Sequence, residues 1–326
     1  MKTVAVARHA MATRFEIVLH GESETALRAA GEAALDEIER LDGQLSLFRE
    51  TSEIAHLNAR AAAGPVRVSP PVFELLRRAQ SLSRETDGAF DVTVAPLMRC
   101  WGFQQGEGRV PDAEDLARAR ERVGMSLVGL GEVDCTVRFT RPGVMLDLGA
   151  LGKGYAVDCA VDILREAGVK SALIHGGTST AYGLGAPPEA EHWTVALPRP
   201  EFGPQFLAPG AAPGRDLPGT ILTKVNLRDE ALSVSAIWGR SFAAGGRTYG
   251  HVMDPRVGAP VEGAVMSAVV APSAADTDAL STALLVLGAA GPEHLAMRWP
   301  ELRTWVVSPR TAAGDFPVHT RGIPVV

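Results

Sequence analysis

The order of strand-like and helix-like segments limits the fold of this sequence more than any other feature. Residues 3–20 read as two strands with near-alternating apolar positions, and apolar residues between Leu27 and Leu41 then recur at helical spacing. Later strands and helices follow one another without the regular alternation that a doubly wound parallel sheet requires. The sequence therefore predicts an α+β fold in which helices pack on a mixed, largely antiparallel sheet.

The later elements are predicted from the same periodicities. Helices are expected at residues 69–86, 112–123, 152–168, 273–287 and 292–298. Strands are expected at residues 135–140, 143–148, 170–177, 193–198, 221–226, 231–236, 248–253, 264–271 and 303–308. A segment dense in Pro and Gly, residues 199–219, reads as a surface insertion. The whole chain, residues 1–326, is expected to form one domain with two lobes.

Composition excludes several classes of protein. Hydrophobic residues make up 46% of the chain and charged residues 21%, which is typical of a globular protein and not of a disordered one. The formal net charge is -6 and no run of Lys and Arg predicts a basic face, so no nucleic-acid partner is expected. No apolar run reaches the ~18 residues of a membrane helix, so no membrane span is expected in this chain.

The cysteines and the N-terminal segment bear on the compartment. Cys100, Cys135 and Cys159 are far apart and form no CxxC pair, which excludes a zinc knuckle and suits a reducing compartment. Charged residues interrupt residues 1–21, which therefore lack the apolar stretch of a signal peptide. A cytoplasmic location is the simplest expectation, although an exported protein whose leader had been removed would look the same.

The segment 271–288, APSAADTDALSTALLVLG, combines an apolar helix with a carboxylate. Asp278 and Thr282 are four residues apart, so both side chains project from one helix face and could supply two hard oxygen ligands to Mg²⁺. The spacing alone favours the alternative, a solvated Asp and a Thr bonded to its own helix. The apolar neighbours place this helix in the core, however, and a buried Asp there requires a partner.

A glycine-rich turn follows a predicted strand in the segment 145–155, MLDLGALGKGY. Backbone N–H groups at such a turn and at the following helix N-terminus suit a phosphate, and Lys153 adds positive charge. Asp147 stands where a carboxylate at a strand end could bond a base or ribose, and the carbonyl of Ala150 could complete a metal shell. The pattern is neither a Walker A nor a G-x-G-x-x-G motif, so it does not predict nucleotide binding by itself.

Residues of three shorter segments could line a ligand site. His251, in the segment YGHVMDPRVG, could be a general base in a strand-to-turn setting, although a structural histidine is the simpler interpretation of this stretch alone. The tight turn at residues 88–91, GAFD, could line a flat aromatic ligand. Gly176 and Gly177 end a predicted strand at a point where the main chain could approach a ligand closely.

Taken together, these motifs resemble one family. The segments MATRFEI, SEIAHLN, DGAFDVTVAPL, LDLGALGKGYAVD, HVMDPRVGAP and TDALSTALLVLG, with the strand that ends in GG, occur in the order found in the ApbE family, the FAD:protein FMN transferases. The similarity runs from about Met11 to Gly288. It implies a T-fold-related α+β architecture in which FAD occupies a cleft between the lobes. It also implies an enzyme that transfers FMN from FAD to a Thr or Ser hydroxyl of an acceptor protein and releases AMP, with Mg²⁺ acting on the phosphoryl oxygens.

The resemblance also implies roles for individual residues. Asp278, Thr282 and the Ala150 carbonyl match the metal ligands of the family, and His251 matches the histidine proposed as the base for the acceptor hydroxyl. The positions expected to line FAD are Met11, Phe48, Ala89, Phe90, Asp91, Asp147, Lys153, Gly176, Gly177, Ser235 and Ala236. The acceptor is expected to be a flavoprotein with a Thr or Ser in a D-x-[ST]-G-A-T-type segment.

The sequence departs from the family pattern at several positions. Phe48 stands where Tyr is common, Thr178 where an acidic or amide residue is often seen, and Ala236 where Gly is usual. These changes bear on substrate preference more than on metal binding. Two alternatives to FMN transfer therefore stay open. One is a Mg²⁺-dependent FAD pyrophosphatase that gives FMN and AMP, and the other is a flavin-binding protein without turnover.

Overall fold

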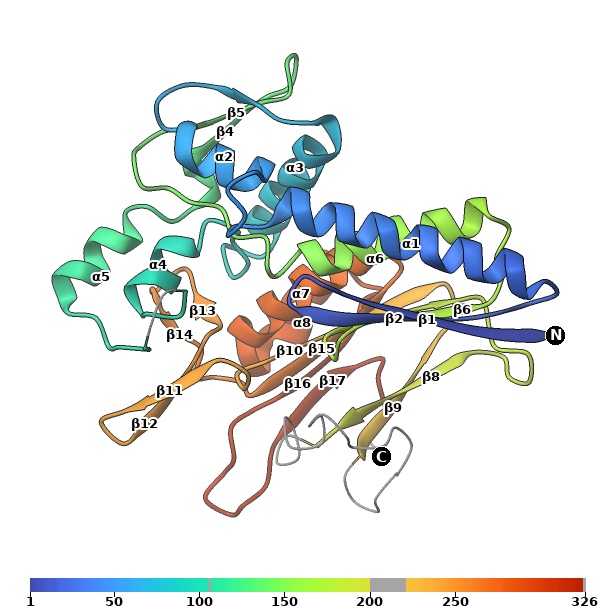
Figure 1. Cartoon of the computed structure of the whole chain (residues 1–326). Helices are drawn as coiled ribbons and strands as arrows, with labels where there is room; N and C mark the ends of the chain where they lie inside the picture. Colours follow the sequence, from blue (N-terminus) through green and yellow to red (C-terminus); the bar gives the residue numbers. More distant parts are fainter. Residues whose placement is uncertain (105–106, 200–220, 325–326) are drawn as a thin grey trace.

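An eight-stranded sheet forms the centre of the molecule (Figure 1). The structure is a computed structural model that describes residues 1–104, 107–199 and 221–324. The strands of the sheet, in spatial order, are β1 (Lys2–Ala10), β2 (Thr13–Gly21), β6 (Ala172–Gly176), β7 (Thr180–Leu184), β10 (Glu230–Ala236), β15 (Met266–Ala271), β16 (Arg303–Val307) and β17 (Val318–Arg321). All neighbouring pairs in this sheet are antiparallel, which confirms the predicted α+β class.

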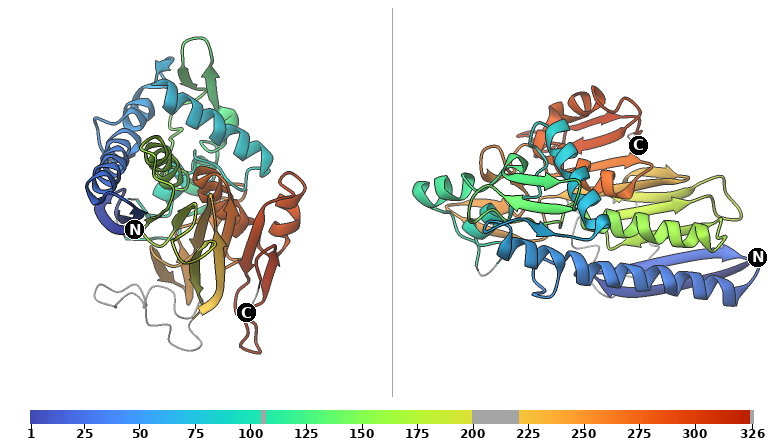
Figure 2. Two further views of the ribbon diagram at one scale, coloured as in Figure 1. Left: turned by 90° about the vertical axis from the view of Figure 1, so that its right-hand side faces the viewer. Right: turned by 90° about the horizontal axis from the view of Figure 1, so that it is seen from above.

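Three helices, α1 (Glu24–Leu45), α6 (Gly152–Glu166) and α7 (Ala274–Leu287), cover one face of this sheet (Figures 1 and 2). Helix α6 lies against both α1 and α7, and α7 packs on β10 and β15. Apolar side chains at helical spacing, such as Leu35 and Ile38 of α1, are fully buried between the helices and the sheet. The helices predicted at 152–168 and 273–287 are confirmed, and α7 lies in the core as its apolar neighbours predict.

The apolar character of α7 extends into the next helix. By length and hydropathy alone, Ala274–Ala296 could cross a membrane, but 61% of its most apolar window is buried inside the fold. Core helices of globular proteins pass the same test. In the structure α7 is followed by a 3-10 turn, Gly288–Ala290, and by α8 (Gly291–Ala296), which contacts β16 and β17. Packing against the sheet therefore accounts for the apolar sequence of this stretch.

The opposite face of the sheet is partly covered by a hairpin of β8 (Trp193–Pro198) and β9 (Ile221–Leu227). The side chains of Trp193 and Leu197 are buried there in a second apolar cluster with residues of β10, β15 and β16. We call this face of the sheet its outer face. Apart from Arg199, the predicted insertion at 199–219 lies outside the described residues.

Smaller elements form a second part of the molecule, above and to the left of the long helices in Figure 1. Its elements are α2 (Glu53–Arg60), α3 (Pro70–Glu85), α4 (Ala95–Cys100), α5 (Ala113–Arg120), the 3-10 turn Met125–Leu127 and a sheet of β3 (Val66–Arg67), β5 (Thr136–Phe139) and β4 (Val128–Gly131). Two hairpins lie near α4 and α5, namely β11 (Ser241–Ala244) with β12 (Arg247–Gly250) and β13 (Met253–Asp254) with β14 (Ala259–Pro260). A bidentate ion pair between Arg78 of α3 and Asp276 of α7, with distances of 2.8 and 2.7 Å, joins this part to the long helices.

Several predicted strands differ from the structure. Residues 143–148 form an irregular segment, in which the Asp147 N–H donates to the Val92 carbonyl at 2.7 Å and no strand lies alongside. Val144, Leu146 and Leu148 are buried, so the alternation that predicted a strand reflects burial of one face without strand pairing. The strand predicted at 248–253 is divided between β12 and β13. The sequence patterns did not predict β3, β4, β7, β11, β14, β17 or α4.

Candidate functional site

A cavity of about 1220 Å³ is lined by both parts of the molecule. It exceeds the roughly 300–1,000 Å³ of typical small-molecule pockets, so it has room for a ligand as large as a dinucleotide. With one exception, Gly176, every residue predicted to act in catalysis, metal binding or FAD binding lines this cavity. These residues are Met11, Phe48, Ala89, Phe90, Asp91, Asp147, Ala150, Lys153, Gly177, Ser235, Ala236, His251, Asp278 and Thr282.

Gly176 and Gly177 serve the packing of the sheet. A Cβ atom at position 176 would lie 2.6 Å from Cε1 of Phe15, so Gly176 lets the Phe15 ring pack against the main chain of β6. Gly177 has a φ of 61° and lines the cavity, and a Cβ there would lie 2.1 Å from Oγ1 of Thr13. At both positions the close neighbour of the main chain is a protein side chain, and the expected approach of the main chain to a ligand stays a prediction.

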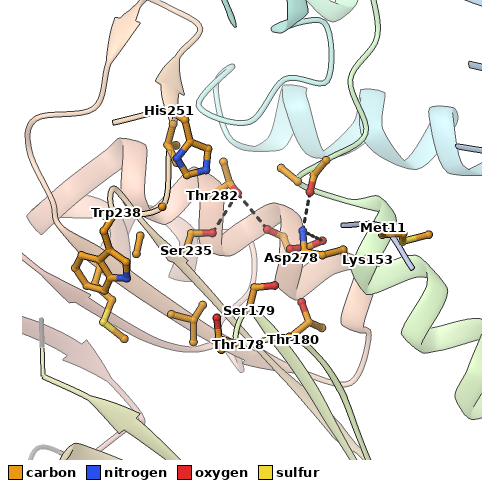
Figure 3. Close-up of a pocket in the computed structure, with 18 of the residues that line it drawn as sticks. Met11, Lys153, Thr178, Ser179, Thr180, Ser235, Trp238, His251, Asp278 and Thr282 are labelled. Atoms are coloured by element: carbon orange, nitrogen blue, oxygen red, sulfur yellow. Dashed lines mark hydrogen bonds and ion pairs between the residues drawn. The ribbon is translucent and has the colours of Figure 1, made fainter. Parts of the chain in front are cut away.

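The N-terminus of α6 meets the first turns of α7 at the metal-ligand candidate Asp278. The Asp278 side chain is buried, and its Oδ2 accepts a hydrogen bond from the Gly154 N–H at 3.2 Å. Lys153 Nζ lies 3.7 Å from the same oxygen (Figure 3). Both neighbours are donors, so they stabilise a negatively charged carboxylate in the core. A Cβ at Gly154 would lie only 2.0 Å from the Ala274 carbonyl oxygen, so glycine is required for this contact between the helices.

A second carboxylate, Asp158 of α6, holds the N-terminus of α7. Its oxygens accept hydrogen bonds from the main-chain N–H groups of Ala274 and Ala275 at 2.7 and 2.9 Å, and from the Ser273 hydroxyl at 2.9 Å. These amides belong to the first turn of a helix, where no main-chain acceptor is available within the helix. Asp158 therefore fixes the position of α7, and with it Asp278, relative to α6.

Thr282 lies one turn after Asp278 on α7, as its spacing predicts. Its hydroxyl donates to the Asp278 carbonyl at 3.3 Å and lies 3.2 Å from the Ser235 hydroxyl of β10 (Figure 3). Ser235 is in turn 2.8 Å from the hydroxyl of Ser281. The bond of Thr282 to its own helix matches the simpler interpretation of the spacing, but the residue also lines the cavity beside Asp278.

The turn at residues 147–150 presents its polar groups to the cavity. Asp147 does not end a strand, but its Oδ1 accepts the Gly149 N–H at 2.9 Å and stabilises the turn. Lys153 Nζ donates to the Gly149 carbonyl at 2.8 Å, which holds the ammonium group over the turn. Gln104, which no motif singled out, donates to Oδ2 of Asp147 at 3.1 Å and also lines the cavity.

The turn before Asp91 shapes the cavity wall. Asp87 and Gly88 both have positive φ, 51° and 74°, which confirms the tight turn predicted there. The Asp91 carboxylate is buried and accepts hydrogen bonds from the Thr93 N–H at 2.8 Å and the Met125 N–H at 2.9 Å. Its charge is therefore used to hold neighbouring loops, and Asp91 contributes to the site through the shape of the wall. Phe48 stands at the rim, with 64% of its surface exposed.

His251 lies in the short connection between β12 and β13, where it lines the cavity. Burial lowers the pKa of its imidazole below the usual value, and the nearby charges of Arg240 and Lys153 lower the pKa further. A main-chain hydrogen bond with Arg240 and the charge of Asp147 oppose this shift. Its Nδ1 is buried and has no hydrogen-bond partner among the described residues. His251 lines the cavity, and a neutral imidazole can accept a proton, so the residue is a candidate general base.

The candidate metal ligands fit a hard cation. The described part of the chain contains no group of three or more His, Cys, Asp and Glu residues placed to hold a metal ion. A site of the kind preferred by zinc is therefore not seen there. Asp278, Thr282 and the turn at Ala150 line one cavity and offer a carboxylate, a hydroxyl and a carbonyl oxygen. This set suits Mg²⁺, which is usually held by one or two carboxylates together with the phosphates of a substrate.

The chain is similar to known proteins in both sequence and structure. The sequence pattern of the ApbE family matches residues 11–304. An FAD:protein FMN transferase from Klebsiella pneumoniae (strain 342) is 31% identical over 252 residues, which are 77% of this chain and 73% of that protein. The crystal structure of the ApbE protein from Thermotoga maritima superimposes with a TM-score of 0.82 at 26% identity, over 98% of this chain and 97% of that one. The flavinyl transferase ApbE from Pseudomonas stutzeri, in its apo form, gives a TM-score of 0.80 at 29% identity, over 98% and 94% of the two chains.

Proposed function

The chain belongs to the ApbE family, and from that premise we propose that it transfers FMN from FAD to a Thr or Ser hydroxyl of an acceptor protein and releases AMP. One observation carries the proposal. A single cavity brings a buried carboxylate, Asp278, and a lysine, Lys153, together with a histidine that has an unpaired buried nitrogen, His251. These are the groups that attack on a pyrophosphate requires, namely charge neutralisation and a proton acceptor.

In the proposed reaction the acceptor oxygen attacks the phosphorus on the FMN side of the FAD pyrophosphate. A bond forms between this oxygen and phosphorus while the bond to the bridging oxygen breaks, and AMP leaves with that oxygen. His251, which lines the cavity, takes the proton of the acceptor hydroxyl on its imidazole. Lys153, held over the turn by the Gly149 carbonyl, places its positive charge where the phosphates would lie.

We further propose that Mg²⁺ binds at Asp278, Thr282 and the Ala150 carbonyl when FAD is present. The ion would act as a Lewis acid on the phosphoryl oxygens. Because Asp278 is the only carboxylate of this set, and Lys153 lies 3.7 Å from it, the protein alone offers a weak site. Phosphate oxygens of FAD would complete the shell, so tight metal binding is expected to require FAD.

One incubation tests this function against its two alternatives. The protein is mixed with FAD, Mg²⁺ and a peptide that carries a D-x-[ST]-G-A-T-type segment, and the products are analysed by mass spectrometry. A covalent FMN–peptide adduct together with free AMP is the expected result. Free FMN and AMP without an adduct would identify a pyrophosphatase, in which water replaces the acceptor hydroxyl. Unchanged, bound FAD would identify a flavin-binding protein without turnover.

A further inference from the structure

The cavity has a second half that the predicted FAD and metal residues leave almost unused. It lies on the outer face of the sheet, away from α6 and α7. Its floor consists of small or apolar side chains from four neighbouring strands, and it is walled by strand β8. We call it the apolar trough and define it by Leu173, Ala181, Leu232, Val234, Ala236, Met266 and residues 194–198. Of the predicted FAD and metal residues, only Ala236 belongs to it.

The wall of the apolar trough is formed by the edge of β8. Five consecutive residues of this strand, 194–198, line the cavity. Successive side chains of a strand point to opposite sides, so side chains alone would bring only every second residue to a cavity. Five consecutive residues can line it because the main chain of β8 itself faces the cavity. On its other edge β8 pairs with β9, from Trp193 opposite Leu227 to Pro198 opposite Ile221. Within the described residues, no strand pairs with the edge of β8 that faces the cavity.

A free strand edge of this kind matches the main chain of an extended peptide. Such a peptide pairs its own N–H and C=O groups with those of the edge, and its alternate side chains enter the pockets beside it. A flavin or adenine ring would leave most of the main-chain groups of the edge unpaired. At about 3.3 Å per residue, the six residues of β8 have room for a paired segment of similar length, roughly 20 Å.

The charges of the lining residues point to the same class of ligand. All three carboxylates of the cavity, Asp91, Asp147 and Asp278, are at the end that holds the predicted metal ligands. None of the residues that define the apolar trough is charged, and Arg240 lies beside His251 at the other end of the cavity. A segment with uncharged side chains therefore fits the apolar trough.

We propose that the apolar trough binds the acceptor protein, whose Thr- or Ser-bearing segment adds to the free edge of β8 as an extended strand. The apolar trough is continuous with the cavity that holds His251, so a segment lying along β8 can deliver its hydroxyl to that histidine. Residues 177–179, which connect β6 and β7, line the same cavity together with Thr180 of β7, and Figure 3 shows residues 178–180 near Asp278 and Ser235. This inference rests on the proposed function, because it takes a protein as the second substrate.

The test measures acceptor binding separately from FAD binding. In Ala196→Trp, a bulky side chain is placed on the exposed wall of the apolar trough. The matched control, Lys224→Trp, places the same side chain on β9 at the residue that pairs with Ala196, outside the cavity. A fluorescent acceptor peptide is titrated into each protein and followed by anisotropy, and FAD binding is followed by flavin fluorescence. We expect Ala196→Trp to weaken peptide binding at least tenfold while FAD affinity stays within twofold, and the control to change neither.

A second measurement uses the unaltered protein, so it does not depend on the folding of a variant. Each amide of the acceptor peptide is N-methylated in turn, which removes one donor at a time. Pairing with β8 predicts that binding weakens at every second position, because alternate amides of a strand face its neighbour. An equal effect at all positions would overturn the strand addition. Equal peptide binding by Ala196→Trp and the parent protein, or loss of FAD binding in that variant, would overturn the location.

The two proposals fail in different ways. Suppose that the labelled peptide binds and that N-methylation weakens its binding at every second amide, but no FMN–peptide adduct forms. The proposed transfer is then wrong and the docking site stands. If the adduct forms equally well with the parent protein and with Ala196→Trp, the transfer stands and the docking site is wrong. Absence of peptide binding to the parent protein also overturns the docking site.

Discussion

The two ends of the cavity are held in place by different interactions. At the polar end, made up of Asp147, Lys153, His251, Asp278 and Thr282, side chains and main-chain amides of α6 and α7 bond directly to one another. The apolar trough has a floor fixed by the main sheet, but its wall, β8, pairs with no strand except β9 in the part of the chain that the structure describes. The chemical groups are therefore rigidly placed, whereas the proposed recognition surface has unused pairing capacity. Substitutions at the polar end should change turnover, and those in the trough should change acceptor binding.

The largest effect on turnover is expected from Asp278→Ala. Removing the one carboxylate among the proposed metal ligands takes away Lewis-acid stabilisation worth several kcal/mol, which corresponds to a rate loss of about 10³-fold or more. The measurement is AMP release at saturating FAD and varied Mg²⁺. Peptide binding in the apolar trough should stay unchanged in this variant. Full activity of Asp278→Ala would contradict the proposed metal site at this end of the cavity.

His251→Ala should have the next largest effect. Loss of a general base costs typically about 10²–10⁴-fold in rate, while FAD should still bind because its phosphates are held elsewhere in the cavity. Single-turnover transfer and flavin fluorescence give the two values separately. If FAD binding is lost together with turnover, His251 contacts the ligand and does not act as the base.

The pH dependence of transfer should also reflect His251. Because burial lowers its pKa below 6.5, the imidazole stays neutral at pH 7, and kcat/KM should fall about tenfold per pH unit only once the pH is below that lowered pKa. The same shift affects stability. Between the two pKa values the unfolded chain binds more protons, so the stabilisation is complete above pH 6.5 and is lost as the pH falls. His251→Ala should lack this acid limb, and its persistence in that variant would assign the limb to another group.

Asp158→Asn should have the smallest effect on turnover, a few-fold, with a clear loss of stability. In the parent protein, two main-chain N–H groups and the Ser273 hydroxyl donate to both carboxylate oxygens of Asp158. The side-chain amide of Asn has only one acceptor oxygen, so it cannot accept all three hydrogen bonds in the same way. The free energy of unfolding should fall by about 1–3 kcal/mol, seen as a lower Tm. Asp112→Asn is the control, because Asp112 caps the exposed helix α5 and Asn caps as well as Asp. A Tm loss of equal size in both variants would contradict the role of Asp158 at the α6–α7 junction.

The sequence predicts the polar end far better than the apolar trough, for physical reasons. Local patterns carry much of the polar end: the spacing of Asp278 and Thr282 and the glycine-rich turn before α6 are each contained in a few residues. Even so, the strand expected before that turn was wrong, because burial of Val144 and Leu146 imitates strand pairing. The partner that the buried Asp278 required is the Gly154 amide, only one residue after the predicted Lys153.

The apolar trough depends on residues that are far apart in sequence. Its floor takes one to three side chains from each of four strands, and β7, one of these strands, was not predicted. Nothing in the alternation of β8 indicates which of its edges pairs with β9 and which faces a cavity. Gln104 is a similar case, since its bond to Asp147 exists only after a loop from the second part of the molecule meets the turn at the start of α6. Single-segment patterns contain no information on such contacts.

The contact at Gly154 has a consequence for how the enzyme begins each cycle. Because the main chains of α6 and α7 touch there with no room for a methyl group, the backbone fixes the distance between the two helices. The Gly154 N–H holds the Asp278 carboxylate, and the Gly149 carbonyl holds the Lys153 ammonium group beside it. The electrostatic part of the site is thus assembled before any ligand arrives. We expect this helix pair to superimpose in ligand-free and FAD-loaded forms, so that conformational adjustment during catalysis is confined to the loops and to the hairpin of β8 and β9.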